Sequence, residues 1–289
     1  MPQNYPKVRF FGLPSTKSGY GNATIAFSKL FSGSKIKTNF VFPKKASKNF
    51  LKDLNNYKEK CNIDLFLHTP PFSMHKTRNY KIGYFYWETD TLPTEWRFDI
   101  IKSLDEIWAP CALVKTACLN AGFKGPIEIV PTPLCYDSTF ATDVFIPSPI
   151  SSNSIFQWHK RKGYQELLKA YFSEFSSNDN VILIIKTNPL NGDSGSVEKI
   201  KFDILSAKNK INKKNPPKIF LITDFLSSND LLSLHSIGDC FVLPHRGEGW
   251  GMPIHEAVQA GNHVITTKYG GITEWLDNDS ANIIRHSLG

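Results

Sequence analysis

Residues 241–261 read FVLPHRGEGWGMPIHEAVQAG. The stretch starts as an apolar strand, continues through a loop with glycine at every second position, and enters a short helix with Pro253 in its first turn. Gly261 stands where a helix C-terminus is expected, and a β-branched run resumes at His263. This order is typical of a βαβ unit in a parallel sheet, where ligands bind beyond the carboxyl ends of the strands.

The glycine loop has the composition of a ligand-binding loop. Gly247, Gly249 and Gly251 allow the backbone to approach a ligand and to point amide groups at it, which suits a diphosphate or sugar hydroxyls. Glu248 lies in the loop and Glu256 in the early part of the helix, and such carboxylates can accept hydrogen bonds from vicinal hydroxyls. The alternative is a tight turn in which Glu256 is merely favoured by the helix dipole. The coincidence of these features favours binding.

The rest of the chain predicts an α/β protein with two domains. Short apolar runs alternate with amphipathic stretches, as in parallel strands joined by crossover helices. A proline-rich stretch at 131–154 interrupts this rhythm, so we expect domains at 1–145 and 146–289. We expect strands at residues 8–12, 39–42, 64–68, 81–86, 106–109, 127–130, 154–157, 181–186, 219–223, 240–243 and 263–267.

Composition bounds the class of protein. The 289 residues are 41% hydrophobic and 21% charged, as in soluble globular proteins, and the N-terminus lacks a secretory signal, so we expect a cytoplasmic protein. The net charge of +8 is compatible with nucleotides, with peripheral contact to anionic lipid or with nucleic acid, but much of it lies in the solvated lysine-rich stretch 208–218. Five scattered cysteines indicate reduced thiols; they are Cys61, Cys111, Cys118, Cys135 and Cys240.

The stretch around Glu248 and Glu256 resembles the Glu-x7-Glu signature of retaining GT-B glycosyltransferases of the family-4 type. The resemblance is specific here and looser over nearly the whole chain. It implies two doubly wound Rossmann-like domains that face each other across a cleft, with the acceptor on the N-terminal side and the nucleotide sugar on the C-terminal side. It also implies that Glu256 holds the ribose. The sugar and diphosphate side is then formed by Glu248, Gly249, Trp250, Gly251 and Met252.

A basic turn precedes the first helix of the second domain. Residues 155–163 read IFQWHKRKG, and Arg161 and Lys162 can neutralise the charge on a departing diphosphate. The turn resembles the family's Arg-Lys-Gly element, which implies that Lys162 contacts the donor diphosphate. The family often has another arginine about six residues upstream, near Phe156 in this chain. Either Arg161 or Lys160 substitutes for it, or charge stabilisation is weaker.

Two stretches of the first domain resemble family elements less specifically. Gly19 and Gly21 lie before an expected helix, similar to the glycine loop that closes over the donor phosphates, although an ordinary loop has the same composition. Residues 82–93 read IGYFYWETDTLP, similar to a subgroup with Trp-Glu-Thr-Asp where many relatives carry His-Asp. We expect Glu88 to touch the acceptor or the donor sugar, Asp90 to cap a turn and His68 to be structural.

Two further turns complete the set of candidate positions. Residues 269–274 read YGGITE and resemble a Gly-Gly-x-x-Glu element that supports the donor site. Asp277 and Asp279 have the spacing of a metal motif, but they follow an expected helix, and we interpret them as a surface turn. The resemblance implies no metal and no cofactor besides the donor substrate.

The sequence therefore predicts a retaining glycosyltransferase. It would move a hexose from a GDP- or UDP-linked sugar to a hydroxyl of a glycan, lipid or small-molecule acceptor, with the leaving phosphate as base and with no nucleic-acid partner. Relatives continue through further helices after the signature, so a truncated C-terminal domain that binds nucleotide sugars without catalysis is one alternative. A glycoside hydrolase that uses Glu248 and Glu256 as acid and nucleophile is another. Base, sugar, acceptor and oligomeric state stay open.

Overall fold

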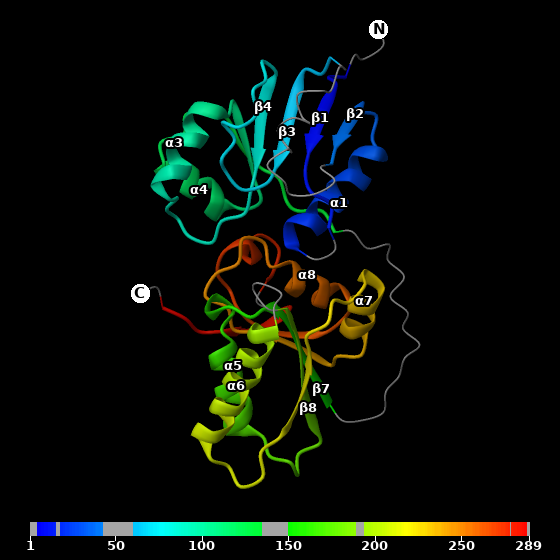
Figure 1. Ribbon diagram of the computed structural model, residues 1–289, viewed down its shortest axis with the longest axis vertical. Coiled ribbons are helices and arrows are strands. Elements are labelled where there is room, and N and C mark those ends of the chain that lie inside the picture. The colour runs from blue at the N-terminus through cyan, green and yellow to red at the C-terminus, as the bar shows by residue number, and fades with distance from the viewer. Residues whose placement is uncertain are drawn as a thin grey trace. The chain divides into compact units, whose positions relative to one another are not determined.

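The computed structural model describes residues 5–15, 18–42, 60–134, 150–188, 194–277 and 279–287. The chain divides into two compact units, Met1–Asp137 and Ser138–Gly289, and each contains a six-stranded parallel sheet with helices (Figure 1). The α/β class with two doubly wound, Rossmann-like units is confirmed. The expected boundary between residues 145 and 146 lies outside the described residues, as does Cys135, so its position stays a prediction.

The first unit has the strand order β2-β1-β3-β4-β5-β6, and every neighbouring pair is parallel. Because the chain moves from β1 to β2 on one side and then to β3 on the other, the switch point lies between β1 and β3. The elements are β1 (Val8–Phe11), α1 (Gly19–Ser32), β2 (Thr38–Val41), β3 (Ile63–Leu67), β4 (Tyr80–Tyr84), α3 (Thr94–Ser103), β5 (Glu106–Ala109), α4 (Ala112–Asn120) and β6 (Ile127–Ile129).

Aromatic residues fill both faces of the first sheet. Phe10 packs against Phe27 of α1 on one face, with ring centroids 6.4 Å apart, while Phe11 stacks on Phe66 of β3 at 4.8 Å on the other. This alternation follows from the two-residue period of a strand. On the same face as Phe11, Arg9 forms an ion pair with the fully buried Asp64 at 2.8 Å, and the pKa of Arg9 is raised chiefly by this hydrogen bond.

The second unit has the order β12-β11-β10-β7-β8-β9, again with parallel neighbours throughout. Its switch point lies between β7 and β10, because the chain runs to β8 and β9 on one side before it returns to β10. The elements are β7 (Ile150–Gln157), η1 (Lys160–Lys162), α5 (Tyr164–Glu174), β8 (Val181–Asn188), α6 (Ser194–Ile211), β9 (Lys218–Ile222), α7 (Ser228–Ser236), β10 (Cys240–Leu243), α8 (Met252–Gln259), β11 (His263–Thr267), η2 (Gly271–Glu274) and β12 (Ala281–Ile284).

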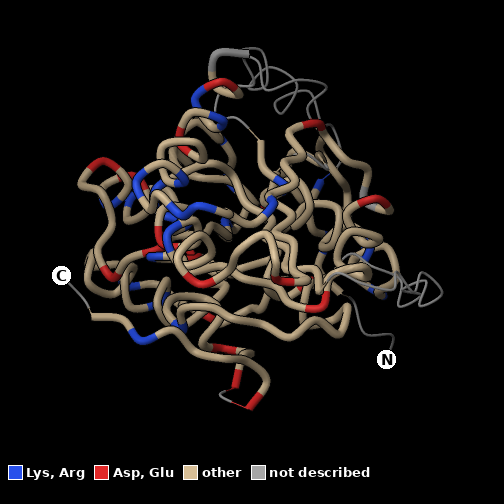
Figure 2. The backbone as a smooth tube through the Cα atoms, turned by 90° about the horizontal axis from the view of Figure 1, so that it is seen from below, with Lys and Arg blue, Asp and Glu red and all other residues tan. Residues whose placement is uncertain are grey.

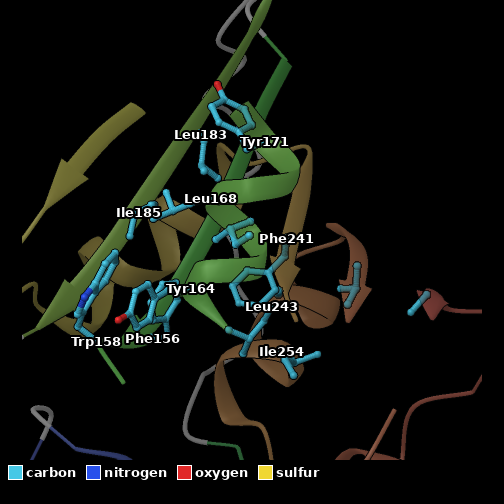
Figure 3. Close-up of a cluster of buried hydrophobic side chains, with 14 of the residues drawn as sticks. Phe156, Trp158, Tyr164, Leu168, Tyr171, Leu183, Ile185, Phe241, Leu243 and Ile254 are labelled. Carbon is cyan, nitrogen blue, oxygen red and sulfur yellow. The ribbon is translucent and has the colours of Figure 1, made fainter. Parts of the chain in front are cut away.

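Helix α5 covers β7 and β8 through a continuous apolar cluster (Figure 3). Leu168 and Tyr171 of the helix lie against Leu183 and Ile185 of β8, and all four are buried. At the carboxyl end of β7, Trp158 stacks on Tyr164 with ring centroids 4.3 Å apart. This packing fixes the start of α5, and therefore the basic turn before it.

All eleven expected strands are present, and β5, β10 and β11 both begin and end where predicted. Strand β7 begins at Ile150 and not at Ser154, because its polar residues are hydrogen-bonded inside the unit. Asn153 donates to the carbonyl of Leu234 at 2.9 Å, and the Ser154 hydroxyl donates to that of Val242 at 2.5 Å. The proline-rich interruption therefore ends sooner than expected. Strand β12 was not expected.

The surplus positive charge is spread along the chain. Lysine and arginine residues are interspersed with acidic ones (Figure 2). In the lysine-rich stretch 208–218, Lys208, Lys210 and Lys214 are exposed. The Lys213 ammonium instead has a structural role, because it donates hydrogen bonds to the carbonyls of Ser173, Glu174 and Phe175 at the end of α5. Within the described ranges, no helix has both the length and the apolar composition needed to span a bilayer.

Candidate functional site

The basic turn and the glycine loop meet at the switch point of the second sheet. Turn η1 follows β7 and the loop at 244–251 follows β10, and these two strands are neighbours. Carboxyl ends of adjacent parallel strands share one edge, so the two segments lie side by side although more than eighty residues separate them. The main-chain amide of Arg246 donates to the carbonyl of Arg161 at 2.7 Å, which joins the segments directly.

Glu248 is the centre of this edge. Its carboxylate Oε1 accepts a hydrogen bond from the Lys162 ammonium and lies 3.4 Å from Nη1 of Arg161. The side chains of Glu248 and Lys162 are only 7% and 11% exposed. Arg161 also donates to the carbonyl of Gly247 at 2.5 Å. The predicted residues Glu248, Lys162 and Arg161 are therefore brought together as one cluster, in which Glu248 and Lys162 are buried and Arg161 is partly exposed.

The two cations decide the charge of the carboxyl. Burial alone would raise the pKa of Glu248, but Lys162 and Arg161 outweigh burial and hold that pKa below its ordinary value. Glu248 is therefore ionised at neutral pH and acts as an acceptor of hydrogen bonds. A general acid needs a proton at neutral pH, so Glu248 is poorly suited to the acid role of a glycoside hydrolase.

His245 is a buried neighbour of this cluster. Its side chain is 1% exposed at the end of β10. Burial lowers the pKa of His245 to about 4, with Lys162 and Arg161 lowering it further and Glu248 opposing them. The imidazole is therefore neutral at pH 7.

Close backbone contacts hold the two segments in register. Gly163, at φ +71°, ends η1, and a Cβ atom there would lie 1.8 Å from the carbonyl oxygen of Pro244. A side chain at this position would push the basic turn away from β10. Arg246 braces the same turn from outside, through the Lys160 carbonyl at 2.5 Å and the Glu166 carboxylate at 2.6 Å.

A second glycine turn supports the loop from the other side. The amide of Gly271 donates to the carbonyl of Glu248 at 2.7 Å, and Glu248 and Gly270 form a parallel β-bridge. A Cβ atom on Gly270 would lie 2.2 Å from that carbonyl oxygen, and one on Gly271 would lie 2.2 Å from that of Gly249. The stretch at 269–274 therefore shapes the loop that carries Glu248, and its supporting position near the donor stays a prediction.

Trp250 and Met252 pack inside the loop–helix corner. Both are buried, and the Trp250 indole donates to Nδ1 of His255 at 3.3 Å. His255 in turn stacks on Trp275 with ring centroids 4.4 Å apart. The Trp250 side chain is thus used in packing between the loop and α8. Contacts of the main-chain amides of Gly249, Trp250, Gly251 and Met252 with the donor stay a prediction.

Glu256 lies on the second turn of α8 and is 5% exposed. Its Oε2 is 3.5 Å from Nε2 of His235, a buried residue in the last turn of α7. The two signature glutamates therefore have different neighbours: two cations for Glu248 and an imidazole for Glu256.

The candidate residues of the first unit follow the carboxyl ends of β1 and β4. Gly19 begins α1 after β1, with Ser18 as its N-cap accepting from the amide of Gly21 at 3.1 Å. Tyr20 accepts a hydrogen bond from the amide of Tyr86 at 2.9 Å, which places the start of α1 beside the half-buried Glu88 segment. Packing also explains the glycine at position 21, because a Cβ atom there would lie 2.0 Å from the carbonyl oxygen of Ser15.

Residues expected to be structural are placed in structural contacts. His68 Nε2 and His75 Nε2 are 2.8 Å apart, and burial lowers the pKa of His68. Asp90 is exposed and accepts from the Thr91 hydroxyl at 3.2 Å. Asp277 accepts from Ser280 at 2.7 Å in an exposed turn. Four cysteines are free thiols, namely Cys61, Cys111, Cys118 and Cys240.

Sequence reasoning assigned no role to His245 or His235. His245 stands inside the quoted motif, directly after the strand, and that position was a usable signal. His235 lies outside every motif, and only the packing of α7 against α8 brings it to Glu256.

Residues 154–285 match the model of the family described as glycosyl transferases group 1. The matched range contains η1, the glycine loop, α8 and the supporting turn at 269–274. Over this range the second unit is similar to the group 1 glycosyl transferases. No curated protein sequence matches the chain.

Solved structures of glycosyltransferases share the fold of this chain over most of its length. HepE of Anabaena in complex with UDP-glucose superposes with a TM-score of 0.65 at 12% identity, covering 94% of this chain and 83% of that one. The E. coli trehalose-6-phosphate structure bound with UDP-2-fluoro glucose gives 0.69 at 11% identity, covering 96% and 87%. The trehalose-6-phosphate synthase OtsA gives 0.71 at 11% identity, covering 96% and 88%. At these identities the likeness shows the fold.

Replacing His245 by Asn should flatten the pH dependence of stability. The unfolded imidazole takes up a proton near pH 6.5, whereas the folded one does so only near pH 4, so acidification through this window destabilises the native protein. The difference in unfolding free energy between wild type and His245→Asn should change by up to roughly 3 kcal/mol between pH 7 and pH 4. Urea unfolding at several pH values measures it, and parallel curves for the two proteins would contradict the assignment.

Replacing Gly270 by Ala should destabilise the second unit by more than about 2 kcal/mol, because the added methyl meets the Glu248 carbonyl. Gly261→Ala is the matched control. Gly261 also has positive φ, +81°, but no atom lies within 4 Å of the added Cβ, so only the backbone cost of about 1 kcal/mol is expected. Equal losses in urea unfolding would show that the contact with the loop is unimportant.

Proposed function

We propose that the chain transfers a hexose from a UDP- or GDP-linked sugar to a hydroxyl of a glycan, lipid or small-molecule acceptor, with retention of configuration. The observation that carries the proposal is the cluster of Arg161 with the buried pair Glu248 and Lys162, at the switch point of a group 1 domain. At this edge of the sheet, the two cations match the diphosphate of a sugar nucleotide, and the ionised carboxylate matches the hydroxyls of its sugar.

Lys162 and Arg161 are assigned to the diphosphate. An ammonium has three N–H donors, and the contact with Glu248 uses one of them, so two are left for phosphate oxygens. Negative charge grows on the leaving diphosphate as the glycosidic bond breaks, and preorganised cations in a buried site stabilise it. Glu248 keeps the ammonium oriented and accepts hydrogen bonds from the sugar hydroxyls.

The remaining donor contacts follow from the loop and α8. Main-chain amides of Gly249, Trp250, Gly251 and Met252 precede or begin α8 and lie at the positive end of the helix dipole, which attracts anions. Glu256 is assigned to the ribose hydroxyls. In the first unit, Gly19 and Gly21 are assigned to the donor phosphates and Glu88 to the acceptor or the donor sugar.

Two features of the reaction are proposals that rest on the family resemblance. The leaving phosphate takes the proton of the acceptor hydroxyl, and no metal is required. The first donor to test is UDP-glucose, because the similar structures of HepE and of the E. coli protein hold UDP-linked glucose compounds.

The donor is tested by thermal shift with UDP-, GDP- and ADP-sugars. A ligand that binds only the folded state raises the midpoint temperature by mass action, and one nucleotide is expected to dominate. Glu256→Ala should abolish the strongest shift, because the ribose loses its acceptor. An unchanged shift in Glu256→Ala would refute the ribose assignment, and a shift without turnover on any acceptor would favour a binding module.

Replacing Lys162 by Met should lower kcat for donor turnover about 10²- to 10³-fold, since one charge opposite the leaving diphosphate is lost. Lys160→Met is the matched control, because Lys160 lies on the same turn with its side chain exposed, and its activity should stay within about twofold of wild type. Donor hydrolysis or transfer assays compare the two variants. Similar losses in both would mean that the turn acts only through its overall charge.

A further inference from the structure

His235 is buried at the end of α7 in a way that needs explanation. Its side chain is 1% exposed, and neither ring nitrogen has a hydrogen-bond partner among the described residues. A buried polar group without a partner costs free energy, and such groups in native proteins usually have a function. A phenylalanine would fill the same space, next to the Phe241 ring at 5.6 Å, without that cost.

The nearest charged group is the signature glutamate. Nε2 of His235 is 3.5 Å from Oε2 of Glu256, and both side chains are more than nine-tenths buried. This distance falls short of full hydrogen-bond geometry, but in a medium of low dielectric the attraction between an imidazole nitrogen that carries a proton and a carboxylate oxygen is strong. His235 is thus one of the neighbours that restrict how the Glu256 carboxylate can turn.

The backbone that carries His235 is held rigidly. Asn262 donates to the His235 carbonyl at 2.7 Å, and Asn153 donates to the Leu234 carbonyl at 2.9 Å. Asn262 also donates its amide to the carbonyl of Ala257 in α8 at 3.0 Å, so the end of α7 is tied to the helix that carries Glu256. A Cβ atom on Gly238 would lie 2.2 Å from the Asn153 side chain, which keeps this junction closely packed.

We propose that His235 is a positioning residue for donor binding. Its Nε2–H holds Oε2 of Glu256, which presents the carboxylate to the vicinal hydroxyls of the donor ribose in one orientation. The inference rests on the proposed function, in which Glu256 is the ribose ligand. His235 itself does not touch the donor.

The test compares four variants by calorimetric binding of UDP or GDP, whichever binds the wild type, and of its 2′,3′-dideoxy form. His235→Phe keeps the packing and removes the N–H, and it should weaken binding of the nucleotide about tenfold. His235→Gln restores an N–H near the same place and should recover most of the affinity. Asn153→Ala loosens the end of α7 without touching Glu256, and Glu256→Gln removes the charge that His235 holds.

The dideoxy nucleotide separates orientation from folding. Because it has no vicinal hydroxyls, it should bind wild type and His235→Phe equally, and the effects of His235→Phe and Glu256→Gln on the natural nucleotide should not add. For transfer, His235→Phe should raise the donor KM and leave kcat within about twofold, since the groups at the diphosphate are intact.

Each failure has its own signature. If Glu256→Gln binds the nucleotide as tightly as wild type does, the assignment of Glu256 to the ribose is wrong, and the positioning role of His235 is then wrong as well. If Glu256→Gln loses affinity but folded His235→Phe does not, only the positioning role is wrong. If Asn153→Ala and His235→Phe weaken the natural and dideoxy nucleotides alike, His235 is structural. Should His235→Phe fail to fold, His235→Leu, which also removes the N–H, takes its place in the same comparison.

Discussion

A carboxylate inside a protein keeps its charge only when cations compensate for the water it has lost, and Glu248 has two of them. Burial and the cations act in opposite directions on its pKa, and the cations prevail. The consequence extends to both partners: Lys162 is held in a buried position where an exposed lysine would be mobile, and Arg161 is drawn onto the loop carbonyl of Gly247. The cluster therefore supplies a fixed anion and fixed cations within one small volume.

The sheet makes this cluster possible and glycines give it its shape. Strands β7 and β10 are adjacent although β8 and β9 lie between them in sequence, so the segments that follow them share an edge. Gly163 lets one segment touch the end of β10, and Gly270 and Gly271 let the supporting turn touch the loop backbone. Because these contacts join backbone to backbone, the main-chain positions of Glu248 and Lys162 do not depend on side-chain rotamers. Preorganisation of this kind is what electrostatic catalysis requires.

Much of the fold could be predicted from the sequence, because buried parallel strands are continuous apolar runs such as 181–186 and 263–267. The predictions were wrong where polar residues are buried with partners. Asn153 and Ser154 belong to a central strand because α7 and β10 offer carbonyls to them, and no local pattern indicates this. Within the site, the composition of the glycine loop predicted Glu248, whereas Lys162 and Arg161 were predicted from the resemblance of the basic turn to the family's Arg-Lys-Gly element. The contact of Glu248 with Lys162 and Arg161 depends on the order of the strands in the sheet. The position of His235 next to Glu256 depends on how α7 packs against α8. Neither could be derived from the periodicity of the sequence.

A crystal structure with a bound nucleotide sugar, UDP-glucose first, tests the central claim most directly. Our account predicts diphosphate oxygens within about 3 Å of the Lys162 ammonium, sugar hydroxyls on Glu248 and the ribose on Glu256. A nucleotide bound away from the carboxyl ends of β7 and β10, with the ion pair of Glu248 and Lys162 untouched, would contradict it.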